Sequence, residues 1–249
     1  MSVKKKSPPR QSGESPLSVN PRGRSLLRQA YEELRRRLTS GEWPPGTRLD
    51  YQRLSVELGL STTPLREAMN HLASEGLVEL VPRLGAVVKR LSRQDLVEIF
   101  EIREAFETYA ATRIAGRLSS RRLDLLEAQV ARMEDIIARL PATGGAILDG
   151  ENLAEFLGAD RAFHLVIIDA LENERLSKLI EDGQVSVLMF NTANPGHTLD
   201  LITRANQEHA HILAALKRGD SLEASRLLGS HIRNSLEGKL EALRSGPKF

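Results

Sequence analysis

The sequence predicts a mainly α protein in two parts, a small helical domain that carries one β-hairpin, followed by an all-α helical bundle. Leu, Ala, Arg and Glu dominate, whereas aromatic residues make up only 4% of the 249 residues, a composition that favours helices over a β-sandwich. Apolar residues recur at helical spacing over most of the chain. One stretch near residue 80 alternates apolar and polar side chains instead, which indicates a hairpin.

The composition also bounds the class of protein. The absence of cysteine excludes disulfides, zinc fingers and thiol catalysis, and it fits a reducing cytosol. No apolar run approaches the ~20 residues of a transmembrane helix, and the basic N-terminus lacks the apolar core of a secretory signal. We therefore expect a cytoplasmic protein without a membrane partner.

Charge is distributed unevenly along the chain. Residues 1–90 hold 16 Lys and Arg against 9 Asp and Glu, a net charge of +7, whereas the remainder holds 19 against 24, a net charge of −5. A basic N-terminal third on an acidic remainder predicts a polyanionic partner for the first part only. Residues 1–22, rich in Ser, Pro, Lys and Arg, read as a disordered basic arm.

The first elements follow from periodicity and punctuation. An amphipathic stripe predicts a helix over residues 24–40, and the turn EWPPGTRL comes next, with Trp43 expected to hold it against the core. Asp50 is a candidate N-cap for a short helix that ends at Gly59.

Residues 58–77, LGLSTTPLREAMNHLASEGL, predict a turn followed by a helix with one buried face. Ser61 occupies the N-cap position, Pro64 is tolerated in the first turn, and Gly76 ends the helix. The predicted buried face has helical spacing and consists of Leu65, Ala68, Met69, Leu72 and Ala73.

A hairpin follows, with Leu77–Val81 as one strand and Ala86–Arg90 as the other. Helix, short helix, turn, helix and hairpin in this order predict a winged helix-turn-helix domain over residues 23–91. In such a domain the second helix of the motif enters the major groove of DNA with its N-terminal end.

Residues 24–90 resemble the DNA-binding domain of the GntR family of bacterial transcription regulators. The resemblance is carried by SGEWPPGTRL, LSVELGLSTTPLREA, LASEGLV and the glycine-containing wing, all in order. It implies a double-stranded DNA operator and a homodimer. Thr62 stands where the family usually has Arg, and Arg83-Leu84-Gly85 replaces its usual G-R-G wing, so the base sequence of the operator does not carry over.

Arg66 is the strongest candidate for a DNA contact, because its guanidinium matches guanine O6 and N7. The alternative for Arg66 is a partnership within the domain with Asn70, Glu67 or Glu75. The complete set of predicted DNA-contacting residues is Ser61, Thr62, Thr63, Arg66, Asn70 and Arg83.

The remaining chain, residues 92–245, predicts an all-helical bundle. Six amphipathic helices are expected, the first capped by Ser92 and running to about residue 118, and the others at about 120–140, 151–171, 175–190, 199–218 and 221–243.

Polar residues interrupt the apolar faces of three of these helices. Asp160 and His164 lie one turn apart on one face, and His209 and His231 lie on the apolar faces of two later helices. One carboxylate with three imidazoles suits a divalent transition metal. The alternative is that each His is an ordinary core residue. His71, His197 and His211 are interpreted as ordinary.

Residues 95–235 resemble the effector-binding FCD domain of the FadR-like branch of the GntR family, through IREAFE, DRAFH, EHAHILAALKRGD and the later His231. Many such domains hold a metal with one Asp and three His, which match Asp160, His164, His209 and His231 here. The resemblance therefore implies a bound zinc, nickel or manganese, which the sequence does not distinguish.

Arg103 is the second polar interruption, on the apolar face of the first bundle helix. Its alternative roles are an ion pair with Glu107, four residues on, or a contact with the effector, as the resemblance implies. Because a guanidinium pairs well with a carboxylate, we expect Arg103 and the metal to hold a small organic acid.

The sequence thus predicts a ligand-responsive regulator of transcription, acting as a repressor and without enzymatic activity. A metal-sensing regulator and an acyl-coenzyme A responder are the alternatives. A metal-dependent hydrolase is the least favoured, because the chain has no H-E-x-x-H motif and no separate catalytic base.

Overall fold

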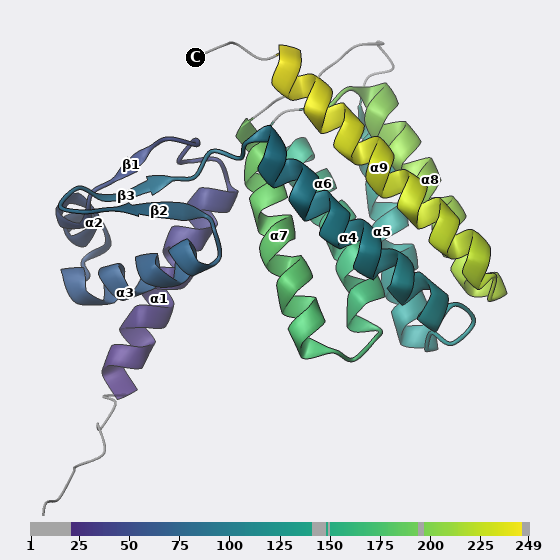
Figure 1. Ribbon diagram of the computed structural model, residues 1–249, viewed down its shortest axis with the longest axis horizontal. Coiled ribbons are helices and arrows are strands. Elements are labelled where there is room, and N and C mark those ends of the chain that lie inside the picture. The colour runs from purple at the N-terminus through teal and green to yellow at the C-terminus, as the bar shows by residue number, and fades with distance from the viewer. Residues whose placement is uncertain (1–20, 141–147, 149, 194–196, 246–249) are drawn as a thin grey trace, which may run out of the picture.

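The computed structural model describes residues 21–140, 148, 150–193 and 197–245, without the side chains of 21–24, 192 and 245. An N-terminal domain with a small sheet lies beside a bundle of long helices, and helix α7 is the part of the bundle that faces this domain (Figure 1). The predicted mainly α architecture is confirmed.

The N-terminal domain has the order expected for a winged helix-turn-helix. Its elements are α1 (Pro21–Thr39), β1 (Arg48–Leu49), α2 (Tyr51–Leu58), α3 (Thr62–Ser74), β2 (Val78–Val81) and β3 (Gly85–Val88). The antiparallel sheet has the order β1-β3-β2, and Val78 pairs with Val88 at one end of the hairpin. The two-residue strand β1 was not predicted, because only pairing with the distant β3 makes it a strand.

Two details of this domain correct the sequence analysis. Helix α1 begins at Pro21, so the last two residues of the predicted disordered arm belong to a helix, and residues 1–20 lie outside the described chain. Proline is tolerated at the first helical position, where its missing N–H group would have no partner. Ser61 is the N-cap of α3, but its side chain accepts no capping hydrogen bond.

Helix α3 ends as its glycine predicts. Gly76 has a φ of 75°, a left-handed conformation that glycine adopts without a steric penalty. The amide of Gly76 donates to the carbonyl of Ala73 at 3.0 Å, and the amide of Leu77 donates to Leu72 at 3.0 Å. These bonds satisfy carbonyls at the end of the helix and direct the chain into the hairpin.

The bundle contains the six predicted helices, with ends shifted by a few residues. They are α4 (Arg93–Ile114), α5 (Ser120–Arg139), α6 (Gly150–Asp169), α7 (Glu174–Ala193), α8 (Leu199–Arg218) and α9 (Ser221–Ser245). Helix α4 starts at a capping box in which Ser92 and Asp95 each bond the other's backbone amide. Phe100 and Phe163 are fully buried in the main core of this bundle.

Helix α7 contributes to the cores of both domains. Val185 and Met189 are buried in the same cluster as Leu65, Met69 and Leu72 of α3. Val187 of the same helix packs in the core of the bundle. The two domains therefore share apolar surface through α7, which places this helix between the DNA-binding motif and the bundle interior.

Candidate metal centre and DNA-contacting surface

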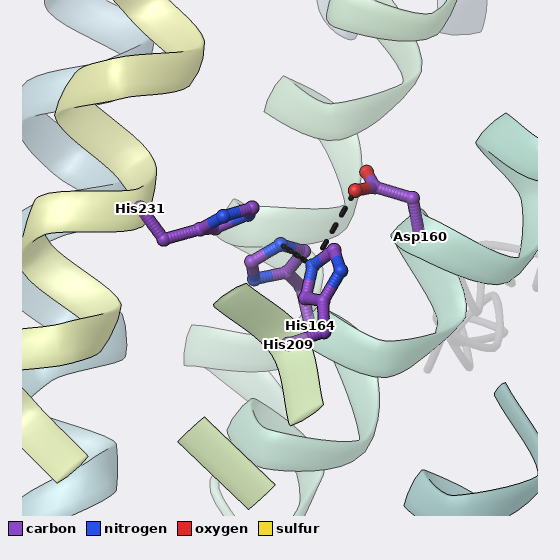
Figure 2. Close-up of side chains that lie close together, drawn as sticks. All are labelled: Asp160, His164, His209 and His231. Carbon is purple, nitrogen blue, oxygen red and sulfur yellow. Dashed lines mark hydrogen bonds and ion pairs between the residues drawn. The ribbon is translucent and has the colours of Figure 1, made fainter. Parts of the chain in front are cut away.

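Three helices bring the four predicted metal ligands together. Asp160 and His164 come from α6, His209 comes from α8 and His231 comes from α9. One ligand atom from each lies within 4.8 Å of all the others. Figure 2 shows the carboxylate and the imidazole rings pointing toward one another inside the bundle. The four residues predicted from separate helices thus form one spatial cluster.

The ring nitrogens are arranged as a metal would require. Nε2 of His209 lies 3.3 Å from Nε2 of His164 and 3.5 Å from Oδ1 of Asp160. Nδ1 of His164 contacts Glu107. In the neutral tautomer in which Nδ1 carries the proton and donates this hydrogen bond, Nε2 of His164 has a free lone pair. Lone pairs this close need a proton or a cation between them. One carboxylate and three imidazoles therefore fit a divalent transition metal.

Two carboxylates contact the Nδ1 atoms of the clustered imidazoles, and the sequence analysis did not predict this role for them. Oε2 of Glu107 lies 2.6 Å from Nδ1 of His164, and Oε2 of Glu208 lies 2.8 Å from Nδ1 of His231. Glu208 also accepts a hydrogen bond from Asn234 at 2.8 Å. Such carboxylate–histidine pairs orient metal-binding rings and increase their basicity. In the sequence, these two carboxylates could be recognised only by their neighbours. Glu107 follows Arg103 by one helical turn, and Glu208 directly precedes His209.

Electrostatics favours the protonation states that bind metals. Desolvation favours neutral Asp160, but the imidazole cluster outweighs it and lowers the pKa of the carboxyl group. Burial lowers the pKa of His209 and of His231. Burial opposes ionisation of Glu107, yet Arg103 and His164 lower its pKa to about 2. The carboxylates are thus ionised and His209 and His231 neutral near pH 7.

Arg103 is 5% exposed, and its Nε donates to Oε1 of Glu107 at 2.8 Å. The alternative ion pair of the sequence analysis is therefore present. The guanidinium also lies 5.0 Å from the ring centre of Phe100 and lines a small cavity that includes Asp160. Arg103 thus contacts the Asp160 and histidine cluster through Glu107 and faces a space next to it.

A larger cavity of about 160 Å³ adjoins the cluster and shares Asp160, Leu157 and Asn191 with the small one. Asp160 and His231 line one end of it, and its wall also includes His197, Asn191 and Lys239. His197 was interpreted as an ordinary loop residue, but it belongs to this wall. The volume is below the ~300–1,000 Å³ of pockets for drug-sized ligands, so the cavity suits a small molecule.

The predicted DNA-contacting residues gather at the N-terminal end of α3 and on the wing. Ser61, Thr63, Arg66 and Asn70 are exposed, Thr62 is partly exposed, and Arg83 is exposed in the turn between β2 and β3. The guanidinium of Arg66 lies 5.5 Å from the ring centre of Tyr51. Among the described residues, Arg66 makes this cation–π contact, and the alternative partnership with Asn70, Glu67 or Glu75 is not formed.

A winged helix-turn-helix joined to a helical bundle that carries a cluster of metal-binding side chains defines a class of DNA-binding regulator. Comparison with known families agrees with this class. Residues 26–88 match "Bacterial regulatory proteins, gntR family", and residues 98–234 match "FCD domain". The chain therefore belongs to the GntR family of transcription regulators, in the branch with an FCD domain.

Similar proteins extend over nearly the whole chain. A regulator from an unstable DNA locus of Streptomyces ambofaciens is 31% identical, over 85% of this chain and 84% of its own length. The transcriptional repressor RspR of Escherichia coli is 25% identical, over 84% and 86%. The solved structure of E. coli McbR/YncC, 22% identical, has the same fold with a TM-score of 0.72, over 87% of this chain and 97% of its own.

Among the described helices, none is both long enough and apolar enough to cross a lipid bilayer.

Proposed function

We propose that this protein is a homodimeric repressor that binds operator DNA and responds to a small organic acid held beside a metal ion in the bundle. The observation that carries the proposal is the position of the Asp160 and histidine cluster at the end of a small-molecule cavity. The cavity lies in a domain that is joined to a DNA-binding motif. The similar protein RspR is a transcriptional repressor, which supports this sign of regulation.

The metal would be held by Asp160, His164, His209 and His231, with zinc, nickel and manganese as candidates. When bound, the ion supplies a Lewis acid that attracts a carboxylate oxygen of the effector. The chain's own residues prepare this position, because Glu107 and Glu208 fix the rings of His164 and His231.

Arg103 would bind the effector next to the cluster. Among the described interactions, Glu107 accepts a hydrogen bond only from Nε of Arg103. Both Nη groups of Arg103 are therefore available for a carboxylate of the effector. Because Arg103 lines the small cavity together with Asp160, one carboxylate could be held by Arg103 and the metal together.

DNA would be bound by the exposed residues of the N-terminal domain. Arg66 would contact a base or a phosphate, Thr62 and Thr63 would contact phosphates or a thymine methyl group, and Arg83 would reach the minor groove or the backbone. Ser61 and Asn70 complete the surface. In a dimer, two such helices would read half-sites about one DNA turn apart.

Helix α7 provides a route between the two functions. Gln184 is buried at the small cavity, and neither of its amide atoms has a partner within the described chain. The next residue, Val185, is buried in the core of the DNA-binding domain. An effector that bonds to one face of α7 would therefore shift the helix against α3 on its other face.

A chain of ion pairs follows the same route. Arg161, next to Asp160, lies 2.9 Å from Glu181 of α7, and Glu181 lies 3.4 Å from Arg35 of α1. Arg35 in turn lies 3.9 Å from Glu75, the C-cap residue of α3. Differential binding of the effector to two arrangements of this network would change the affinity for DNA.

The test is a thermal-shift screen of small carboxylic acids on the full chain, with and without Zn²⁺, Ni²⁺ or Mn²⁺, followed by gel shifts on a selected operator. We expect metal-dependent stabilisation by an acid and release of DNA by the same acid. If metal alone controls DNA binding, the metal-sensing alternative is favoured. That alternative assigns no ligand to the cavity. Turnover of an acid would favour the hydrolase.

A further inference from the structure

The cavity has a second polar end that the metal cluster does not explain. Lys239 of α9 lines this cavity, and its Nζ donates to Oγ of Ser235 at 3.1 Å. Its Nζ also lies 5.5 Å from the ring centre of Phe100, but none of the described carboxylates forms an ion pair with Lys239. A partly buried ammonium group without a counter-ion is unfavourable, which indicates that a ligand supplies the missing charge.

Helix geometry aims Lys239 back at the metal cluster. His231, Ser235 and Lys239 are spaced by four residues, so they lie on one face of α9. Lys239 is about 12 Å along the helix axis from His231, at ~1.5 Å per residue. Side chains tilt toward the N-terminus of a helix, and the bond to Ser235 shows that Lys239 bends in this direction. A short molecule could therefore span from the cluster to Nζ.

Neutral polar groups also line this cavity. Asn191 is 6% exposed, and its Oδ1 has no hydrogen-bond partner within the described chain. Nδ1 of His197 is likewise buried and unpartnered there. Burial, followed by repulsion from Lys239, lowers the pKa of His197 to about 4, so its ring is neutral near pH 7. Both side chains line the cavity and can hydrogen-bond a bound polar group.

The charge balance of the site favours an effector with two negative charges. The carboxylates are Asp160, Glu107, Glu208 and Glu181, and the cations are Arg103, Arg204, Lys239 and Arg161, which pairs with Glu181. Burial lowers the pKa of Lys239 to about 8, which leaves it mostly protonated near pH 7. A bound divalent ion then gives the site an excess of two positive charges. A dianion neutralises this excess, and a monoanion neutralises only half of it.

We infer that the effector is a small dianionic acid whose second acidic group binds Lys239, with hydrogen bonds from Asn191 and His197. This inference rests on the proposed function, in which the first acidic group binds at the metal and Arg103. The short span along α9 requires the two acidic groups to be separated by only a few atoms.

The experiment compares probes that differ by one carboxylate. Binding of succinate and butyrate, and of malate and 3-hydroxybutyrate, is measured by calorimetry on the full chain loaded with Zn²⁺. We expect the dianion of each pair to bind at least ~10-fold more tightly, about 1.4 kcal/mol, because it gains a charge-assisted hydrogen bond to Nζ. The substitution Lys239→Met should remove this preference and leave the affinity for the monoanion unchanged, whereas Lys239→Arg should retain it.

Lys178→Met is the matched control, since Lys178 pairs with Asp182 on the outer side of α7. Melting temperatures without acid show whether each variant is folded. Equal binding of both members of a pair, or a preference that survives in Lys239→Met, overturns the second acidic subsite and leaves the proposed function intact. If no acid binds in any metal state, both the inference and the proposed function are wrong.

Discussion

At the scale of single residues, the buried carboxylate Glu107 connects two parts of the site. It accepts from Arg103 and holds the ring of His164, and its side chain is fully buried. Each of its oxygens thus serves a different partner. This arrangement explains how a charged Arg and a His can occupy apolar helix faces, since the same carboxylate satisfies both.

We predict that Glu107→Gln lowers metal affinity by ~10–100-fold, because the amide no longer orients and polarises His164. The measurement is competition for Zn²⁺ with a chelator of known affinity. Glu104→Gln, partly exposed between α4 and α9 and paired with Arg233, is the control. A lower melting temperature with unchanged metal affinity would assign Glu107 a purely structural role.

Arg66 carries the residue-scale prediction for DNA. Arg66→Ala should weaken operator binding by about 1–3 kcal/mol, because one charged contact to a base or phosphate is lost. Gel shifts at constant salt on an operator selected from random DNA measure this effect. Arg226 lies near the N-terminal end of α9 and pairs with Glu223. The control variant Arg226→Ala should bind the operator as tightly as the parent protein does. Equal affinities for the two variants would remove Arg66 from the DNA-contacting surface.

At the scale of elements, the junction between the wing and α4 depends on one side chain. Asp95 completes the capping box with Ser92, and it also accepts from Nζ of Lys89, just after β3, at 2.8 Å. The hydrogen bond from Lys89, followed by that from Ser92, lowers the pKa of Asp95 to about 2. Its stabilisation is therefore complete above its ordinary pKa of 3.8 and is lost as the pH falls toward 2.

Asp95→Ala should lower the free energy of unfolding by about 1 kcal/mol at pH 7, the typical effect of losing a helix cap. Urea unfolding measures the change. Gln94→Ala, an exposed neighbour that bonds only Glu98, serves as the control. If the two variants unfold at the same urea concentration, the capping box does not stabilise this junction.

At the scale of the whole molecule, α7 lies between the small cavity of the bundle and the DNA-binding domain. Its residues Gln184 and Val185 face different domains, and Glu181 bridges Arg161 and Arg35. Coupling between the two sites needs an element with two arrangements that both ligands influence. The geometry of α7 makes it the element on which such coupling is best tested.

Glu181→Gln should reduce the effect of the effector on DNA affinity, because it breaks the ionic connection between α6 and α1. The ratio of operator Kd with and without the acid should fall toward one, while metal affinity stays unchanged. Asp182→Asn, the adjacent residue that pairs with Lys178, is the matched control. A ratio that is the same in Glu181→Gln and the parent protein would exclude this network from the coupling.

The amino-acid sequence by itself determined the helices, the hairpin and the four candidate metal ligands. Helical spacing placed Asp160 and His164 on one face, Asp50 and Gly59 marked the ends of α2, and the order of motifs indicated the family. These are local features, and local periodicity and capping are encoded by neighbouring residues.

Only the tertiary structure decided which distant residues meet. It paired Glu107 with His164 and Glu208 with His231, brought Lys239 and His197 into one cavity, and joined α7 to the core of the DNA-binding domain. Strand β1 exists for the same reason, since its partner lies almost forty residues away. Helix packing sets these contacts, and the period of a single helix contains no information about its neighbours.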